Sequence, residues 1–138
     1  MTRPRTKLKS LSEERRQDFV ARIDKLSYGS IVINGKKHMR DVLIFADGTV
    51  RKRKGSFLVL GSHNIRKEEI EQLAQAEPEV MVIGTGTHGN ARLASDIKDW
   101  ARESNLILIV QPSYEAIIKL NELTEQGKKV AALIHITC

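Results

Sequence analysis

The sequence is poor in cysteine, in aromatic residues and in long apolar runs. Its single cysteine, Cys138, excludes an internal disulfide and a metal site built from cysteines alone, which fits a reducing compartment. Only 4% of the residues are aromatic, so the core must be aliphatic. No window approaches the roughly 18 apolar residues that a membrane helix needs. The first residues, MTRPRTKLKS, contain no apolar stretch like that of a signal peptide. We therefore expect a cytoplasmic protein without membrane insertion.

The chain has 138 residues, of which 41% are hydrophobic and 29% charged, as is typical of one compact domain. Its net charge of +6 is unevenly distributed. Residues 1–26 hold eight basic and four acidic side chains, residues 27–60 hold seven and two, and residues 61–138 hold eight and eleven. The basic first half indicates either an anionic partner or simple solubility.

Residues 1–26 form a predicted leader outside the main domain, which we expect to span residues 27–138. Ser10 and Glu13 have the spacing of a capping box, and Phe19, Ile23 and Leu26 recur near one helical face. This pattern predicts an amphipathic helix over residues 10–26, preceded by a basic arm.

From Tyr28 the apolar pattern alternates, and Asn34-Gly35 and Asp47-Gly48 are turn signals. The pattern predicts an antiparallel meander with strands over residues 28–33, 37–46 and 49–53, and FLVL at residues 57–60 can add an edge strand.

After residue 63, short apolar strands alternate with helices, as in parallel βαβ units. Helices are expected at residues 66–76, 90–103 and 114–126, and strands at 79–83, 106–110 and near the end of the chain. The fold class is therefore α/β, one domain that joins the meander to a βαβαβ unit.

One glycine motif, G-x-G-x-x-G at residues 84–89, follows a predicted strand and opens a predicted helix. The acidic residue that a dinucleotide site needs about 20 positions later is missing. The motif can instead bind a small anion, or serve only as a sharp turn. Ser113 follows the next strand as a possible helix cap, so a pocket at this sheet edge is predicted. Its candidate ligand-binding residues are Gly84, Thr85, Gly86, His88, Gly89 and Ser113.

Three polar residues lie on otherwise apolar faces of their elements, namely Asp41, Asn121 and His135. Buried polar groups are either hydrogen-bonded within the structure or belong to a site, and the structural role is the commoner one. Asp41 and His135 are the pair that we expect to meet.

Neither a metal site nor a nucleic-acid site is favoured. His135 and Cys138 point to opposite faces of a regular strand, and the histidines lack the spacing of metal ligands. Residues 51–54, Arg-Lys-Arg-Lys, have no aromatic platform beyond Phe57, and a basic strand edge also prevents pairing with other chains. We expect no cofactor.

Several separated segments resemble the Mth 938-like family, a domain of unknown function: residues 28–50, SHNI at 62–65, PEVMVIGTGTHG at 78–89, and GKKVAALIHITC at 127–138. The resemblance implies a three-layer α/β domain with a mixed sheet. Relatives include a mitochondrial complex I assembly factor and an adipogenesis-associated protein. The positions that match the family pattern are Asp41, His63, Gly84, Gly86, Asn121, His135, Thr137 and Cys138.

These observations favour a binding or assembly-assisting domain without catalysis, with a polar cleft at the carboxyl ends of its parallel strands. A protein partner or a small anion is expected, and Asp41, His63, Asn121 and His135 are the cleft candidates. One alternative is an enzyme that acts on a small anionic or phosphorylated ligand at the glycine turn, with Asp41, His63 or His135 moving protons. A second alternative is nucleic-acid binding by the basic half.

Overall fold

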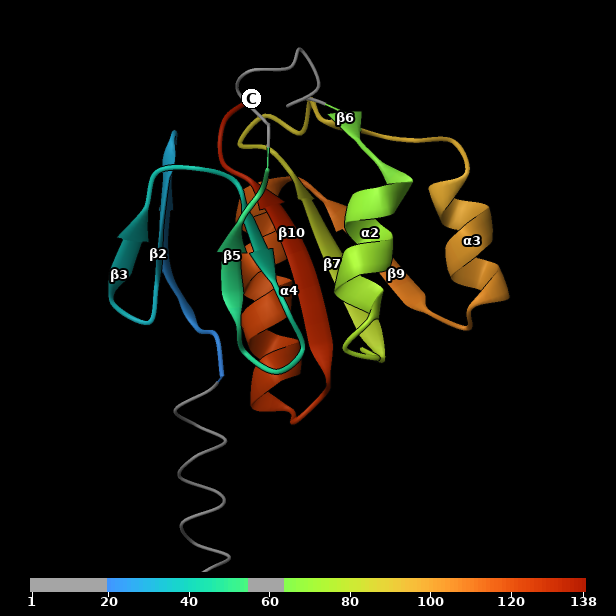
Figure 1. The fold of residues 1–138 in the computed structure, drawn as a ribbon. Helices are drawn as coiled ribbons and strands as arrows, with labels where there is room; N and C mark the ends of the chain where they lie inside the picture. The colour runs from blue at the N-terminus through green and yellow to red at the C-terminus, as the bar shows by residue number, and fades with distance from the viewer. Residues whose placement is uncertain (1–19, 55–63) are drawn as a thin grey trace, which may run out of the picture.

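The computed structural model describes residues 20–54 and 64–138 (Figure 1). Its strands and helices are short, and they alternate in the second half of the chain. In chain order they are β1 Ile23–Ser27, β2 Ser30–Ile33, β3 Lys36–His38, β4 Val42–Ile44, β5 Val50–Lys52, β6 Asn64–Ile65, α2 Lys67–Ala74, β7 Val80–Thr85, β8 Arg92–Leu93, α3 Ile97–Glu103, β9 Ile107–Gln111, α4 Ser113–Glu125 and β10 Val130–His135.

Five strands form the central sheet, in the order β5-β4-β10-β7-β9. β10 and β9 run parallel to β7, whereas β4 runs antiparallel to both β10 and β5. Every residue of β7 and β10 is buried, as expected of parallel strands covered on both faces. The predicted βαβαβ unit and mixed sheet are confirmed.

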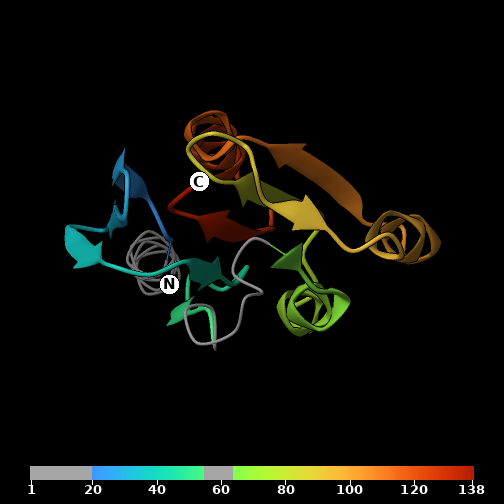
Figure 2. The ribbon, with the colours of Figure 1, turned by 90° about the horizontal axis from the view of Figure 1, so that it is seen from above.

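Helices cover both faces of this sheet and produce the three layers (Figure 2). Because side chains alternate along a strand, Val82 and Ala132 pack on the α4 side with Leu120. Their neighbours Met81 and Leu133 pack on the opposite side, against α2 and α3. The core is aliphatic, as predicted, and no helix within residues 20–54 and 64–138 has the length and apolarity to cross a bilayer.

The predicted meander is split between two sheets. β1, β2 and β3 form a separate three-stranded antiparallel sheet, with a turn at Asn34 and Gly35 whose φ values are 50° and 78°. β4 and β5 form the second predicted hairpin, but β4 pairs with β10 rather than with β3. The expected strand over residues 37–46 is therefore wrong at its centre. There Asp41 instead directs its side chain to the backbone of Ile136.

The predicted leader helix is wrong at its carboxyl end, because Ile23–Ser27 form β1. Ile23 and Leu26 are buried at a spacing of three, which is also a helical spacing. The pairing of β1 with β2 shifts its register between Ile23 and Lys25. This irregularity lets two strand residues three positions apart face the same side. Residues 20–22 are not helical either. Residues 10–19 of the predicted helix and the possible strand over residues 57–60 lie outside the described residues.

Two helices differ from their predicted extent or orientation. α3 begins at Ile97 instead of residue 90, because β8 intervenes and pairs with β6. The apolar spacing in residues 114–126 predicts that Tyr114 and Ile118 face inward together with Asn121, but in α4 these two side chains are 45% and 60% exposed. These two side chains therefore belong to the surface.

Candidate functional site

The carboxyl ends of β7, β10 and β9 meet at one edge of the sheet, as predicted. Ser113, at the start of α4, connects them: its Oγ accepts a hydrogen bond from Gly86 N at 2.8 Å and donates one to His135 O at 2.6 Å. Thr85 Oγ1 donates to Gln111 O at 3.1 Å. A Cβ on Gly84 would lie 2.7 Å from Ser113 Oγ, so glycine is required for this approach.

The glycine turn packs against the last residues of the chain. Thr87 N donates to Thr137 O at 2.7 Å, and His88 N and Asn90 N donate to Cys138 O at 3.2 and 3.0 Å. Gly89 N donates to Gly86 O at 3.1 Å. Gly86 has a φ of 108°, and a Cβ there would lie 2.2 Å from the Cys138 carbonyl carbon.

The expectation that the motif opens a helix is wrong. Residues after the turn enter β8, and α3 begins only at Ile97. The turn therefore lacks a helix N-terminus, which was the source of positive potential in the predicted anion site. Its amide groups bond to other parts of the chain, and glycine serves close backbone packing at Gly84 and Gly86.

Asp41 and His135, expected to meet, form a buried pair. Asp41 Oδ2 lies 2.6 Å from His135 Nδ1, and Asp41 Oδ1 accepts from Ile136 N at 2.9 Å. His135 is 1% exposed and Asp41 5%. The two polar residues that the strand pattern predicted on apolar faces are therefore in direct contact, although Asp41 precedes β4 instead of lying within a strand.

Arg53 completes this cluster and was misread from the sequence. The prediction placed residues 51–54 on a charged strand edge, but Arg53 is 2% exposed. Its Nη1 donates to Asp41 Oδ2 at 2.9 Å, and its Nε donates to Glu69 Oε1 at 2.5 Å. Nη2 reaches Glu69 Oε2 and Asn64 O at 3.0 and 2.5 Å. Arg53 is the first residue after β5, so the direction of its side chain depends on the residue at which the strand ends.

The surroundings of Asp41 favour its carboxylate form. Burial alone raises the pKa of Asp41, but the hydrogen bond and charge of His135, the Ile136 N–H and Arg53 outweigh burial and leave the pKa below its usual value. An ionised carboxylate only accepts hydrogen bonds, so His135 Nδ1 carries a proton. When the ring is neutral, its Nε2 is an acceptor, and Thr137 Oγ1 lies 3.2 Å from it.

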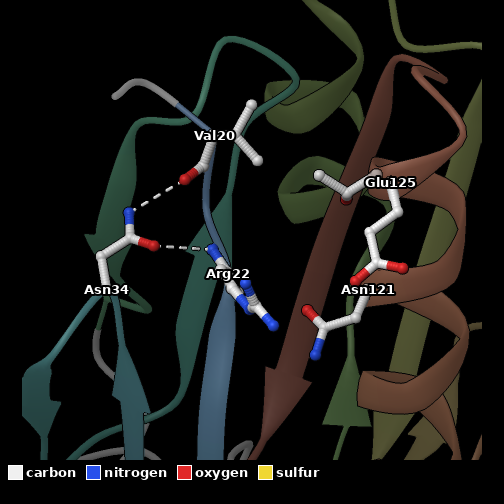
Figure 3. Close-up of a pocket in the computed structure, with 6 residues that line it drawn as sticks. Val20, Arg22, Asn34, Asn121 and Glu125 are labelled. Carbon is white, nitrogen blue, oxygen red and sulfur yellow. Dashed lines mark hydrogen bonds between the residues drawn. The ribbon is translucent and has the colours of Figure 1, made fainter. Parts of the chain in front are cut away.

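Asn121 has a different position and role. Its Oδ1 accepts from Ile23 N at 3.0 Å and its Nδ2 donates to Ile23 O at 2.9 Å, so one side chain attaches β1 to α4. It also lines a pocket of about 550 Å³ between β1 and the last turns of α4 (Figure 3). The lining residues are Val20, Arg22, Asn34, Asn121, Thr124 and Glu125.

His88, a predicted site residue, is not part of the buried cluster. His88 is exposed, and its ring centroid lies 6.5 Å from that of Tyr28, whose hydroxyl is 3.6 Å from Cys138 Sγ. His63 lies outside the described residues. In the ranges 20–54 and 64–138, no three His, Cys, Asp or Glu side chains are placed to share a metal ion.

Comparison with known proteins gives a consistent family signal. Residues 23–135 match the family model described as a protein of unknown function, DUF498/DUF598. The solved structure named MT938 is 32% identical, with a TM-score of 0.71, and the match covers 86% of this chain and 99% of that one. A conserved hypothetical protein, PH1505 from Pyrococcus horikoshii OT3, is 28% identical over 85% and 99% of the chains, with a TM-score of 0.74.

A more distant structure shares the fold. A Bordetella pertussis protein described as a Mth938-like domain is 14% identical with a TM-score of 0.62, and the match covers 86% of this chain and 87% of that one. Among curated proteins no significant match was found.

Replacing Asp41 by Asn tests the electrostatics of the cluster. Because the folded pKa of Asp41 is lowered, its carboxylate stabilises the fold above the unfolded pKa of about 3.9, and this contribution is lost as pH falls through the folded pKa. Asp41→Asn should lower the unfolding free energy at pH 7 by about 3–5 kcal/mol. It should also reduce the loss of stability between about pH 5 and pH 2.

Urea unfolding followed by circular dichroism across this pH range measures both effects. Asp99→Asn is the matched control, because the Asp99 side chain is 73% exposed and its Oδ1 lies 3.8 Å from Arg102 Nη1. An Asp41→Asn variant with the wild-type pH profile would refute the assignment of an ionised, stabilising Asp41.

Proposed function

The chain belongs to the DUF498/DUF598 family of proteins of unknown function, and we propose that it acts as a binding domain for a protein partner. The partner contacts the seam between β1 and α4, which we call the seam surface: Tyr28, Tyr114 and Ile118 at one end, and Arg22, Asn121 and Glu125 at the other. This proposal moves the binding site away from the polar cleft expected at the strand ends.

The observation that carries this proposal is a row of side chains along one side of α4, all exposed except half-buried Asn121. Tyr114, Ile118, Asn121 and Glu125 recur at helical spacing, and Asn121 fixes the direction of the row because it bonds to β1. Tyr114 and Ile118 are 45% and 60% exposed. Apolar side chains aligned in this way are a common anchor for a partner's helix or extended segment.

Charged groups complete the other end of the seam surface. Arg22 and Glu125 line the pocket from opposite sides, and neither forms an ion pair in the described part of the chain (Figure 3). Side chains of this kind at the rim of an interface favour orientation and association rate more than affinity. The partner segment therefore carries apolar side chains at one end and charged groups at the other.

The buried cluster supports the same interpretation. Asp41 and Arg53 are 5% and 2% exposed and satisfy one another, and the turn amides bond to the last residues. Polar groups that are already hydrogen-bonded within the chain stabilise the fold and do not serve to bind an exchanging ligand. We therefore assign recognition of the partner protein to the seam surface.

Site-specific photo-crosslinking tests the proposal. A photoreactive amino acid at position 118 should capture one dominant protein in cells that express the full chain. An Ile118→Glu exchange in the same protein, combined with the crosslinker at position 114, should reduce that capture at least tenfold.

Met39 provides the matched control because it is 67% exposed and lies outside the seam surface. Met39→Glu should leave the capture at position 114 unchanged. Equal capture from positions 39 and 118, or capture insensitive to Ile118→Glu, would refute the proposed surface.

A second candidate function, acyl transfer at Thr137, is favoured by one specific observation. Asp41, His135 and Thr137 are linked at 2.6 and 3.2 Å, the arrangement by which an oriented histidine activates a hydroxyl. Thr137 Oγ1 would attack an ester carbonyl and pass its proton to His135 Nε2, which returns it to the leaving alcohol. Water would then hydrolyse the acyl-threonine by the reverse proton path.

Reaction with p-nitrophenyl acetate tests this second candidate. The wild-type chain should release nitrophenol faster than the solution without protein and should carry an acetyl group on the peptide containing Thr137. Thr137→Val and His135→Gln should both abolish the modification. Release that is the same in all three proteins would exclude catalysis by this group.

A further inference from the structure

β9 forms one edge of the central sheet, and its outer side is open (Figure 2). β7 pairs with its inner side in parallel register, from Val80 opposite Ile107 to Gly84 opposite Gln111. No other strand in the described part of the chain pairs with β9. An unpaired edge presents backbone groups that can bond to another strand.

The direction of these groups follows from one hydrogen bond. Ile107 N donates to Glu79 O at 3.4 Å, so Ile107 directs its backbone groups toward β7. In a parallel pair, alternate residues face the neighbouring strand, which assigns Ile109 and Gln111 to the same direction. Leu108 and Val110 therefore direct their N–H and C=O groups outward.

The two edges of the sheet differ in how they are protected. β5, at the opposite edge, is a strand of three residues that includes Arg51 and Lys52. β9 is a strand of five residues, Ile-Leu-Ile-Val-Gln, without charge or proline. Ile107 and Val110 are 60% and 38% exposed. Charge normally prevents pairing at such edges, and β9 lacks it.

We propose that β9 pairs antiparallel with β9 of a second copy of this chain, around a two-fold axis through Ile109. In this register Leu108 of one copy lies opposite Val110 of the other, and each pair exchanges two hydrogen bonds. Ile109 lies opposite its own equivalent. The two five-stranded sheets become one continuous sheet.

A second copy fits this edge because the pattern of outward groups is self-complementary. Two-fold rotation about Ile109 exchanges Leu108 with Val110, so every outward donor meets an acceptor without further adjustment. The pairing is also limited at both ends. Pro112 has no N–H, and Leu106 N already donates to Ala101 O at 2.9 Å. This short self-matching register favours a copy of the chain over an unrelated strand.

Mass measurement and amide exchange of the full chain test the inference. Light scattering after size exclusion should give twice the monomer mass of 15.5 kDa at high concentration and the monomer mass on dilution. Amide exchange at Leu108 and Val110 should slow at least tenfold from the dilute to the concentrated sample. Ile109, bonded to β7, should exchange slowly in both samples.

Charge placed on the edge should prevent the pairing. Val110→Lys should yield a monomer, and Met39→Lys, a control at an exposed residue outside the central sheet, should yield the wild-type dimer. A monomer at all concentrations with rapid exchange at Leu108 and Val110 would overturn the inference, as would a dimer that survives Val110→Lys. The exchange experiment uses the wild-type chain, so it remains decisive if Val110→Lys does not fold.

Discussion

The buried guanidinium of Arg53 is the charge around which the domain is assembled. It contacts Asp41 ahead of β4, Glu69 in α2 and the carbonyl of Asn64 in β6, and Asp41 in turn holds His135 and Ile136 at the end of β10. A buried charge is tolerated only where such partners surround it. The segments that carry Asp41, Arg53 and Asn64 therefore have to converge. Their convergence brings the β4–β5 hairpin, β10 and α2 together.

Polar groups at the sheet edge and polar groups along the seam have different surroundings. At the carboxyl ends of the parallel strands, Ser113 and the amides of the glycine turn are bonded to the chain itself. Polar groups along the seam between β1 and α4 line an open pocket, next to exposed Tyr114 and Ile118. The sheet edge that commonly holds ligands in α/β folds is here occupied by the protein's own last residues.

Periodic features of the fold could be predicted from the sequence, whereas features that depend on tertiary contacts could not. The alternation that marked Asp41 and His135 located the central pair, because strand periodicity is a local property. The burial of Arg53 was not predicted, because the sequence of a basic run is the same whether all its side chains are solvated or one of them points into the core. The helix expected up to residue 26 failed because an irregular strand reproduces a spacing of three. The glycine motif does not open a helix as expected, because close backbone packing at Gly84 and Gly86 also requires glycine.

The most direct test of this account is a double-mutant cycle between Arg53 and Asp41, measured as urea unfolding free energies of the wild type, Arg53→Met, Asp41→Asn and the double variant. If the buried ion pair organises the domain, each single substitution costs about 3–5 kcal/mol, because it removes one partner from a buried network of charged and hydrogen-bonded groups. The double variant should then cost less than the two single costs together, with a coupling of at least about 1.5 kcal/mol. Additive costs, or single variants as stable as the wild type, would contradict the account.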